Sequence, residues 1–206
     1  MRLYGLLVFF SLFILGAVNC SAQGFDVLAE IDKNEELTAV GNVCPSELVQ
    51  SEDIQFVNKT KFCSTNHETC FMRCTQGSSN HCFGLANHFN RNDVDDKHTR
   101  RLYAKSCQLG DAGGCTNVAA SLKNFDGLDA AQCYTETFRK TCKAEDAWGC
   151  TMYAVSLVDG EGVEKSNKLA LQALQNLEKL CDVDDPFRAC TEGRALATEI
   201  RNGEFD

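Results

Sequence analysis

Several residue types are scarce in this sequence, and each scarcity excludes a class of protein. Only two prolines occur in 206 residues, so long uninterrupted helices are possible. The formal charge is −9, and a diffuse acidic balance of this size argues against a nucleic-acid surface, which needs clustered Lys and Arg. Beyond the N-terminal segment no stretch is apolar enough to span a membrane.

Histidine is also scarce. The four histidines are spread over several expected helices instead of being clustered as zinc ligands are: His67, His81, His88 and His98. We therefore predict no metal, no cofactor and no catalytic residue.

Cysteine, in contrast, is abundant, with thirteen residues. Cys20 belongs to residues 1–22, which have the pattern of a cleaved signal peptide: Arg2, the apolar run Leu6–Val18 and then small residues. Lipidation at Cys20 is an alternative that Asn19 disfavours. Cleavage leaves twelve cysteines in a secreted or periplasmic protein, which favours disulfides over zinc ligation or reactive thiols.

The cysteines recur in pairs. Three pairs have seven residues between their members, a fourth has eight, and the first members are 33, 35 and 39 residues apart. A period of this length is typical of a helical repeat array. The pairs are Cys74/Cys82, Cys107/Cys115, Cys142/Cys150 and Cys181/Cys190.

The residues after the second cysteine of each pair also repeat. The fourth residue on is Ala86, Ala119 or Ala154, and Arg194 breaks the rule. Small and apolar residues at spacings of four and seven share one helical face and allow close helix packing. Each repeat is thus predicted to hold a helix A (Cys82–Asn90, Cys115–Lys123, Cys150–Val158) and a helix B (Asp95–Cys107, Asp129–Cys142, Lys168–Cys181), with Cys190–Ile200 as a last helix A.

Three lysines precede the first cysteine of a pair by two residues: Lys105, Lys140 and Lys179. We interpret them as cations in the last turn of each helix B, where they complement the helix dipole. They need no functional role on this interpretation.

Each cysteine pair lies where one helix B ends and the next helix A begins. We predict a disulfide within each of the four pairs, because such a bond fixes the angle between consecutive repeats. Closing a ring of about nine residues contributes about 2.5 kcal/mol of stability.

Four cysteines are left over: Cys44, Cys63, Cys70 and Cys133. Cys63 and Cys70, at i and i+7 on one expected helix, are predicted to be too far apart to bond. Cys44 is a candidate partner for either of them. Cys133 either reaches back to the N-terminal region or stays a buried free thiol, and we lean slightly to the free thiol.

The chain divides into three predicted parts: a signal peptide (1–22), an irregular N-terminal cap (23–62) and a repeat region (63–206) of about three repeats plus a terminal helix. Within the cap, two runs fit either short strands or helix fragments: Phe25–Ile31 and Leu37–Val43. Asn58-Lys59-Thr60 is a glycosylation sequon, which is meaningful only in a eukaryotic host.

The stretch Asp159-Gly-Glu-Gly-Val163, followed by Lys168-Leu-Ala170, resembles Sel1-like repeats. With the cysteine pairs, the chain is similar to the disulfide-bridged, cysteine-rich secreted proteins of Helicobacter type, over about Cys63–Ile200. The resemblance implies an all-α fold: a disulfide-stapled, right-handed αα-solenoid of TPR-like repeats. Residues 124–127 lack the G-x-G form, and the Cys181/Cys190 pair has one extra residue plus Pro186, which puts the orientation of the last helix in doubt.

The resemblance also implies a function: binding of a peptide or protein on a concave face lined mainly by helices A. The candidate binding residues are Trp148, Tyr153 and Asn117, and Trp148 is alternatively a packing plug. We expect a monomer with a peptide or protein partner, and no nucleic-acid or membrane partner.

Two other functions remain open. The family is associated with penicillin binding and weak β-lactamase activity, so a weak hydrolase or a binder of penicillin-like or peptidoglycan ligands is the main alternative. However, no serine has a lysine three positions later, so the Ser-x-x-Lys pair is missing. The third hypothesis is a thiol-dependent assembly factor that uses Cys133.

Overall fold

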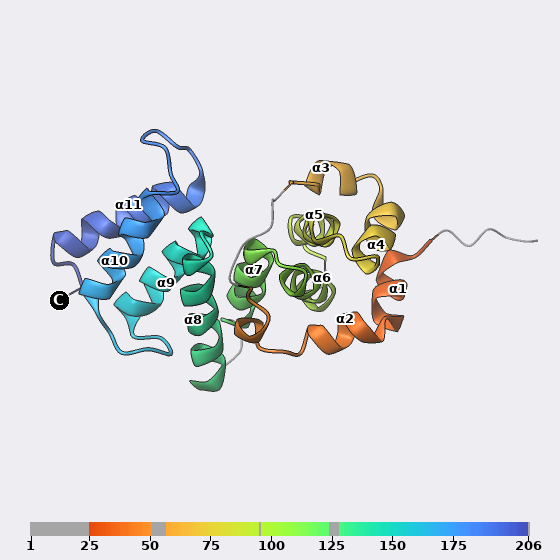
Figure 1. Ribbon diagram of the computed structural model, residues 1–206, viewed down its shortest axis with the longest axis horizontal. Coiled ribbons are helices and arrows are strands. Elements are labelled where there is room, and N and C mark those ends of the chain that lie inside the picture. Colours follow the sequence, from red (N-terminus) through yellow and green to blue (C-terminus); the bar gives the residue numbers. More distant parts are fainter. Residues whose placement is uncertain (1–24, 51–56, 95, 124–127, 206) are drawn as a thin grey trace, which may run out of the picture.

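The computed structural model describes residues 25–50, 57–94, 96–123 and 128–205, and all regular secondary structure within these ranges is helical (Figure 1). The predicted all-α class is therefore confirmed. The predicted signal peptide, residues 1–22, lies outside the described residues. None of the described helices combines the length and the apolar character that crossing a membrane requires.

The helices are α1 (Val27–Lys33), α2 (Glu35–Val40), the 3-10 helix η1 (Pro45–Glu47), α3 (Thr60–Cys63), α4 (His67–Thr75), α5 (Ser79–Asn90), α6 (Asp96–Gln108), α7 (Ala112–Leu122), α8 (Leu128–Lys143), α9 (Ala147–Asp159), α10 (Asn167–Glu178) and α11 (Arg188–Arg201).

Helices that follow one another in the sequence pack against one another. From α4 on, each helix contacts the next, and α9 also contacts both α7 and α11. In Figure 1, α1–α6 lie at one end of the long axis and α9–α11 at the other, with α7 and α8 between them. Each end has its own core, with Leu85 and Leu102 in the first and Leu157 and Leu177 in the second, while Phe138 of α8 is fully buried between them.

One kind of turn recurs between α4 and α5, α6 and α7, and α8 and α9. Each turn has three residues, and the middle one has a left-handed backbone: Gly77 (φ 96°), Gly110 (φ 96°) and Glu145 (φ 64°). Two backbone hydrogen bonds close the end of the preceding helix; in the second turn they run from Gly110 N to Cys107 O (2.9 Å) and from Asp111 N to Ser106 O (3.1 Å). This is a Schellman motif, which ends a helix abruptly.

The last residue of the turn caps the next helix. An Asp111 carboxylate oxygen accepts a hydrogen bond from Gly114 N (3.2 Å), and Asp146 accepts one from Gly149 N (2.6 Å). Because these aspartates are the N-caps, α7 and α9 begin three residues before the predicted starts at Cys115 and Cys150. The second cysteine of each pair therefore lies within the first turn of its helix.

Glycine in the first turn allows the two helices at a junction to approach closely. A Cβ atom on Gly114 would lie 2.9 Å from the Cβ of Ser106, and one on Gly149 would lie 2.9 Å from the backbone nitrogen of Cys142. Real Cβ atoms essentially never come so close to other atoms, so a side chain at either position would push the helices apart.

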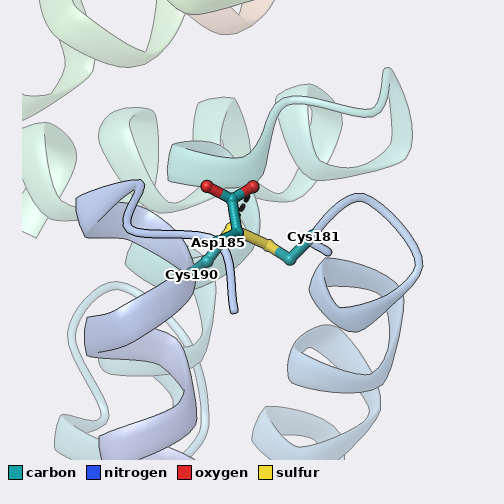
Figure 2. A group of neighbouring side chains, drawn as sticks. All are labelled: Cys181, Asp185 and Cys190. Atoms are coloured by element: carbon teal, nitrogen blue, oxygen red, sulfur yellow. Dashed lines mark hydrogen bonds between the residues drawn. A yellow bond between two sulfur atoms is a disulfide. The ribbon is translucent and has the colours of Figure 1, made fainter. Parts of the chain in front are cut away.

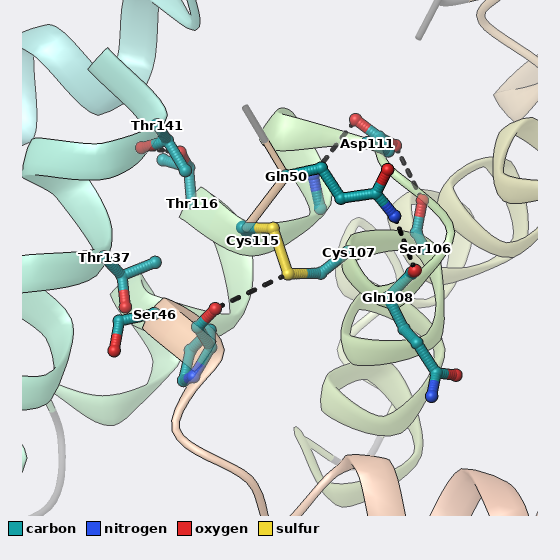
Figure 3. The surroundings of a disulfide bond; sticks show 12 residues. Ser46, Gln50, Ser106, Cys107, Gln108, Asp111, Cys115, Thr116, Thr137 and Thr141 are labelled. Carbon is teal, nitrogen blue, oxygen red and sulfur yellow. Dashed lines mark hydrogen bonds between the residues drawn. A yellow bond between two sulfur atoms is a disulfide. The ribbon is translucent and has the colours of Figure 1, made fainter. Parts of the chain in front are cut away.

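The structure contains disulfides within all four predicted pairs. Figure 3 shows Cys107–Cys115 between the end of α6 and the first turn of α7, with Ser46 of η1 nearby. The Cα atoms of this pair are 4.6 Å apart, and those of Cys142–Cys150 are 4.3 Å apart. The close approach at the glycines thus brings the cysteines within bonding distance.

Two further disulfides contradict the predictions for the leftover cysteines. Cys63 and Cys70 are bonded, with Cα atoms 5.7 Å apart, because they lie on separate helices, α3 and α4, with a reversal at residues 64–66. Cys44 is bonded to Cys133 on α8, with Cα atoms 5.9 Å apart. The free thiol favoured for Cys133 is therefore wrong, as is the pairing of Cys44 with Cys63 or Cys70, whereas the alternative in which Cys133 reaches back to the N-terminal region is confirmed.

The segment 25–50 is more regular than the predicted cap and docks on the helices that follow. Its α1 carries Asp32, which accepts hydrogen bonds from Lys97 Nζ (2.7 Å) and Arg101 Nη1 (2.8 Å) of α6. The hydrogen bonds from Lys97 and His98 hold the pKa of the Asp32 carboxyl well below its usual range. These contacts fix α1 against α6.

Two of the three helix-end lysines take part in the same docking. Lys105 is buried and forms an ion pair with Glu36 of α2, and Lys140 donates a hydrogen bond to the carbonyl of Ser46 (2.7 Å). The helix-dipole interpretation misses these contacts, because their partners lie far away in the sequence. Only Lys179, whose hydrogen bond goes to Asn176 (3.0 Å), makes a purely local contact among those described.

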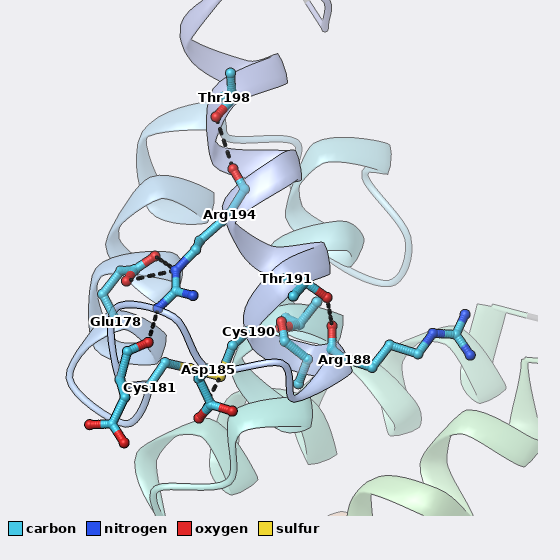
Figure 4. A network of polar contacts seen from close by, with 11 residues as sticks. Glu178, Cys181, Asp185, Arg188, Cys190, Thr191, Arg194 and Thr198 are labelled. Atoms are coloured by element: carbon cyan, nitrogen blue, oxygen red, sulfur yellow. Dashed lines mark hydrogen bonds and ion pairs between the residues drawn. A yellow bond between two sulfur atoms is a disulfide. The ribbon is translucent and has the colours of Figure 1, made fainter.

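The extra residue in the Cys181/Cys190 loop shifts the register of α11. In this helix Gly193, not residue 194, faces the neighbouring helix, where a Cβ atom would meet Leu177. Arg194 points outward and binds Glu178 (3.2 Å) and the carbonyl of Asp182 (2.6 Å), as Figure 4 shows. The small residue that packs against the neighbouring helix is thus Gly193, one position before the place where the other repeats have alanine. Arg194 stands at the alanine position itself.

Candidate functional site

A pocket of about 360 Å³ runs across α5, α7, α9 and the residue that precedes α11. We call it the groove. Its walls include Phe83 and Asn87 of α5, Gly113 and Asn117 of α7, Trp148 of α9, and Phe187. Every helix among these corresponds to a predicted helix A. Its volume is in the range of small-molecule and side-chain binding sites.

Aromatic side chains form one part of the groove. The rings of Trp148 and Phe187 meet edge to face, with centroids 6.3 Å apart and an interplanar angle of 76°. Phe187 is 48% exposed and Trp148 is half-buried, so both rings leave apolar surface open to the groove. Phe83 packs against Tyr103 (5.5 Å between centroids) and supplies a further ring.

Phe187 reaches this position because of the longer loop between Cys181 and Cys190. The backbone nitrogen of Phe187 donates a hydrogen bond to Asp185 Oδ1 (2.9 Å), which fixes the chain just before α11. The extra residue and Pro186, noted only as departures from the repeat, therefore shape the site. Sequence reasoning missed Phe187, and this irregularity was the available signal.

Side-chain amides form a second part. Asn117 donates a hydrogen bond to the carbonyl of Gly113 (2.8 Å), one turn back in its own helix. Asn87 donates one to Thr60 Oγ1 (2.9 Å). Both side chains are therefore oriented before any ligand arrives, and their amide oxygens can accept a hydrogen bond from a ligand.

Carboxylates form the third part. Asp111 and Asp146 are held by the N-cap bonds already described and by hydroxyl donors: Ser106 Oγ to Asp111 (2.6 Å) and Thr116 Oγ1 to Asp146 (2.6 Å). Glu145 lies beside Asp146 and is exposed, and its side chain makes no hydrogen bond or ion pair with any described residue. Arg91 also lines the groove and is the one positively charged side chain among the described lining residues.

The structure brings together two of the three candidate binding residues. Trp148 and Asn117 both line the groove, so Trp148 is open to a ligand while it also packs on Phe187. Tyr153 does not join them: it lines a separate pocket of about 220 Å³ between α8, α9 and α10. The reason is that Tyr153 lies further along α9, on the side that faces α8 and α10.

Metal ligation has little support in the described residues. The one group of suitable side chains is Cys181, Asp185 and Cys190, shown in Figure 2. Both sulfur atoms are joined in a disulfide, so neither is a thiolate donor. The histidines are not clustered around a common point either: His67 stacks on His88 (4.9 Å between ring centroids), while His98 lies beside Asp32 (3.1 Å).

Nucleophilic chemistry is not supported by the groove. The described residues that line it include no serine, threonine, cysteine, histidine or lysine. The described lining therefore lacks the hydroxyl or thiol nucleophile with a histidine or lysine base that is typical of acyl transfer. Cys133, the residue of the thiol-dependent hypothesis, is in a disulfide and carries no free thiol.

Comparisons with protein-family models, with curated proteins and with solved structures find no match for this chain. The family membership suggested by the Asp159–Val163 stretch therefore stays a resemblance. The six disulfides are typical of proteins in oxidising compartments, such as secreted proteins.

Proposed function

We propose that the protein is a secreted or periplasmic interaction scaffold: a disulfide-stapled solenoid of Sel1-like helix pairs that binds a peptide or protein segment in the groove. The observation that carries the proposal is the groove itself, which crosses consecutive A helices and presents aromatic and amide side chains.

The solenoid interpretation is supported by the repeated junction. At α6–α7 and at α8–α9 the same elements recur: a left-handed residue, an aspartate N-cap, a first-turn glycine and a disulfide. A unit that repeats its junction also repeats its orientation, so equivalent helices line one continuous face.

The chemistry of the groove suits a peptide better than a small apolar ligand. Oriented amide side chains such as Asn117 can hydrogen-bond a peptide backbone, while the rings of Trp148 and Phe187 accept a side chain. Aromatic residues that remain partly exposed are typical of the anchor positions of protein interfaces. Because Asn117 lies on α7 and Trp148 on α9, a ligand that contacts both must extend across the two helices.

The test is selection of a displayed library of random twelve-residue peptides against the oxidised protein. Synthetic copies of the selected peptides are then titrated while the fluorescence of Trp148, the only tryptophan, is recorded. We expect Phe187→Ala and Asn117→Ala to weaken binding at least fivefold, because a partly exposed contact of this kind is worth about 1 kcal/mol.

Tyr153→Phe is the matched control, since Tyr153 lies outside the groove. Circular dichroism checks that each variant is folded. Selected peptides whose affinity is unchanged by both groove variants, or the selection of no peptide at all, would contradict the proposal.

A further inference from the structure

We infer that the groove selects a basic partner segment, with a lysine or arginine side chain seated between the aromatic rings and the carboxylate of Glu145. This inference rests on the proposed function and specifies the chemistry of the partner.

The charge balance of the groove is the first argument. Three carboxylates line it, those of Asp111, Glu145 and Asp146, against the single guanidinium of Arg91. Hydroxyl and amide donors make hydrogen bonds to Asp111 and Asp146, which stabilise the charged form of each carboxylate. A cation that enters the groove therefore meets a net negative potential.

The aromatic rings are the second, independent argument. Lysine and arginine bind well to aromatic faces, and arginine combines this with a planar contact and hydrogen bonds to a carboxylate. Trp148 lies three residues after Glu145 in the sequence, and its ring packs edge to face against the ring of Phe187. A long side chain can thus place its alkyl part on the rings and its charge at the carboxylate.

Glu145 is the side chain best placed to receive that charge. Its carboxylate is exposed and makes no hydrogen bond or ion pair with the described residues, whereas Asp111 and Asp146 accept the hydrogen bonds that cap α7 and α9. A ligand cation at Glu145 would therefore gain an ion pair without breaking an existing one.

The backbone at Glu145 agrees with this assignment. The equivalent turns have Gly77 and Gly110, which adopt a positive φ without steric cost, while Glu145 adopts φ 64° with a side chain present. A glycine would suit the turn better, so the turn itself gives no reason for a glutamate.

An acidic partner is the alternative that Arg91 alone would support. Arg91 is exposed at the end of α5, and it is outnumbered by the carboxylates. An acidic segment would have to approach Glu145, Asp111 and Asp146 in order to reach the rings. The observations therefore favour a basic partner.

The experiment repeats the peptide selection with wild-type protein and with Glu145→Gln, which keeps the size of the side chain and removes its charge. We expect the peptides selected by the wild type to be enriched in lysine or arginine. We expect their affinity to fall about fivefold in Glu145→Gln, and equally when the basic residue of the peptide is replaced by norleucine. When Glu145→Gln is combined with the norleucine peptide, the loss of binding free energy should be no larger than for either change alone, because both changes remove the same ion pair.

Glu164→Gln, at an exposed carboxylate outside the groove, is the matched control and should leave the affinity unchanged. Peptides that depend on Phe187 and Asn117 but show no excess of basic residues would overturn this inference and leave the proposed function standing. Additive losses in the combined change would overturn it as well. Peptides that depend on neither groove residue would overturn both.

Discussion

The disulfide between Cys44 and Cys133 provides a quantitative test of how the N-terminal segment is held. It joins residues 89 positions apart, whereas every other disulfide spans nine positions or fewer. In the loop-entropy treatment a closed loop of this length raises the free energy of unfolding by about 4.5 kcal/mol. The shorter disulfides inside the loop reduce its effective length by roughly twenty residues, which lowers the figure only to about 4 kcal/mol, since the dependence is logarithmic.

We therefore expect the double variant Cys44→Ser/Cys133→Ser to lose about 4 kcal/mol of unfolding free energy. Both cysteines are half-buried, so lost packing adds little to the effect. The matched comparison is Cys181→Ala/Cys190→Ala, whose short ring predicts a loss of about 2.5 to 3 kcal/mol.

The assay is urea unfolding of the oxidised proteins, followed by far-ultraviolet circular dichroism and by Trp148 fluorescence. Coincident transitions by the two probes show that unfolding is two-state. Because the unfolded chain of Cys44→Ser/Cys133→Ser is less compact, its slope should be steeper than that of the wild type, and each free energy is extrapolated with its own slope. A loss of unfolding free energy below about 2.5 kcal/mol for Cys44→Ser/Cys133→Ser, the value expected for a short ring, would refute the reasoning.

Three further predictions concern single residues. Replacing Glu145 with glycine should raise the free energy of unfolding by about 0.5 to 1 kcal/mol, because relief of the left-handed strain exceeds the extra freedom of the unfolded chain; a loss in urea unfolding would contradict this. Gly149→Ala should cost about 2 to 3 kcal/mol by overpacking the junction, while Gly113→Ala, whose Cβ atom would meet the Asp111 carboxylate at 3.3 Å and needs a shift of only a few tenths of an ångström, should cost clearly less; equal thermal shifts would refute the distinction. The hydrogen bonds of Glu161 with Lys123 and Tyr134 lower its pKa below the usual 4.5, so its contribution to stability is present above pH 4.5 and is lost as the pH falls through the lowered value. Acid unfolding of Glu161→Gln should lack this part of the pH dependence.

Local spacing predicted the junctions of the fold but not its long-range contacts. The pairs such as Cys142/Cys150 lie in one turn, so their spacing alone locates the bond. The bond from Cys44 to Cys133 depends on how the N-terminal segment docks on α8, and no periodicity carries that information. The Cys63–Cys70 bond was missed for a different reason: the chain reversal at residues 64–66 was interpreted as helix.

The site was predicted in the same partial way. Asn117 was chosen on a predicted helix A and Trp148 in the loop just before another, and the groove contains both because α9 begins before Trp148 and packs against α7. Phe187 depends on the length of one loop, which the repeat pattern treats as an exception. Glu145 had a visible signal: it occupies the third position after Cys142, where Gly77 and Gly110 stand in the other repeats.

The distribution of disulfides along the chain also bears on how the protein acquires them. Twelve cysteines can pair in on the order of ten thousand ways, which makes random oxidation a poor route to one product. Five of the six bonds, however, join cysteines seven to nine residues apart, and loops of that size close within about 100 ns. Each can form within its own helical junction as the chain is synthesised, before the next cysteines are available. Only Cys44 must wait, unpaired, until Cys133 arrives, so the choice of partner that an isomerase would have to correct is confined to a single thiol.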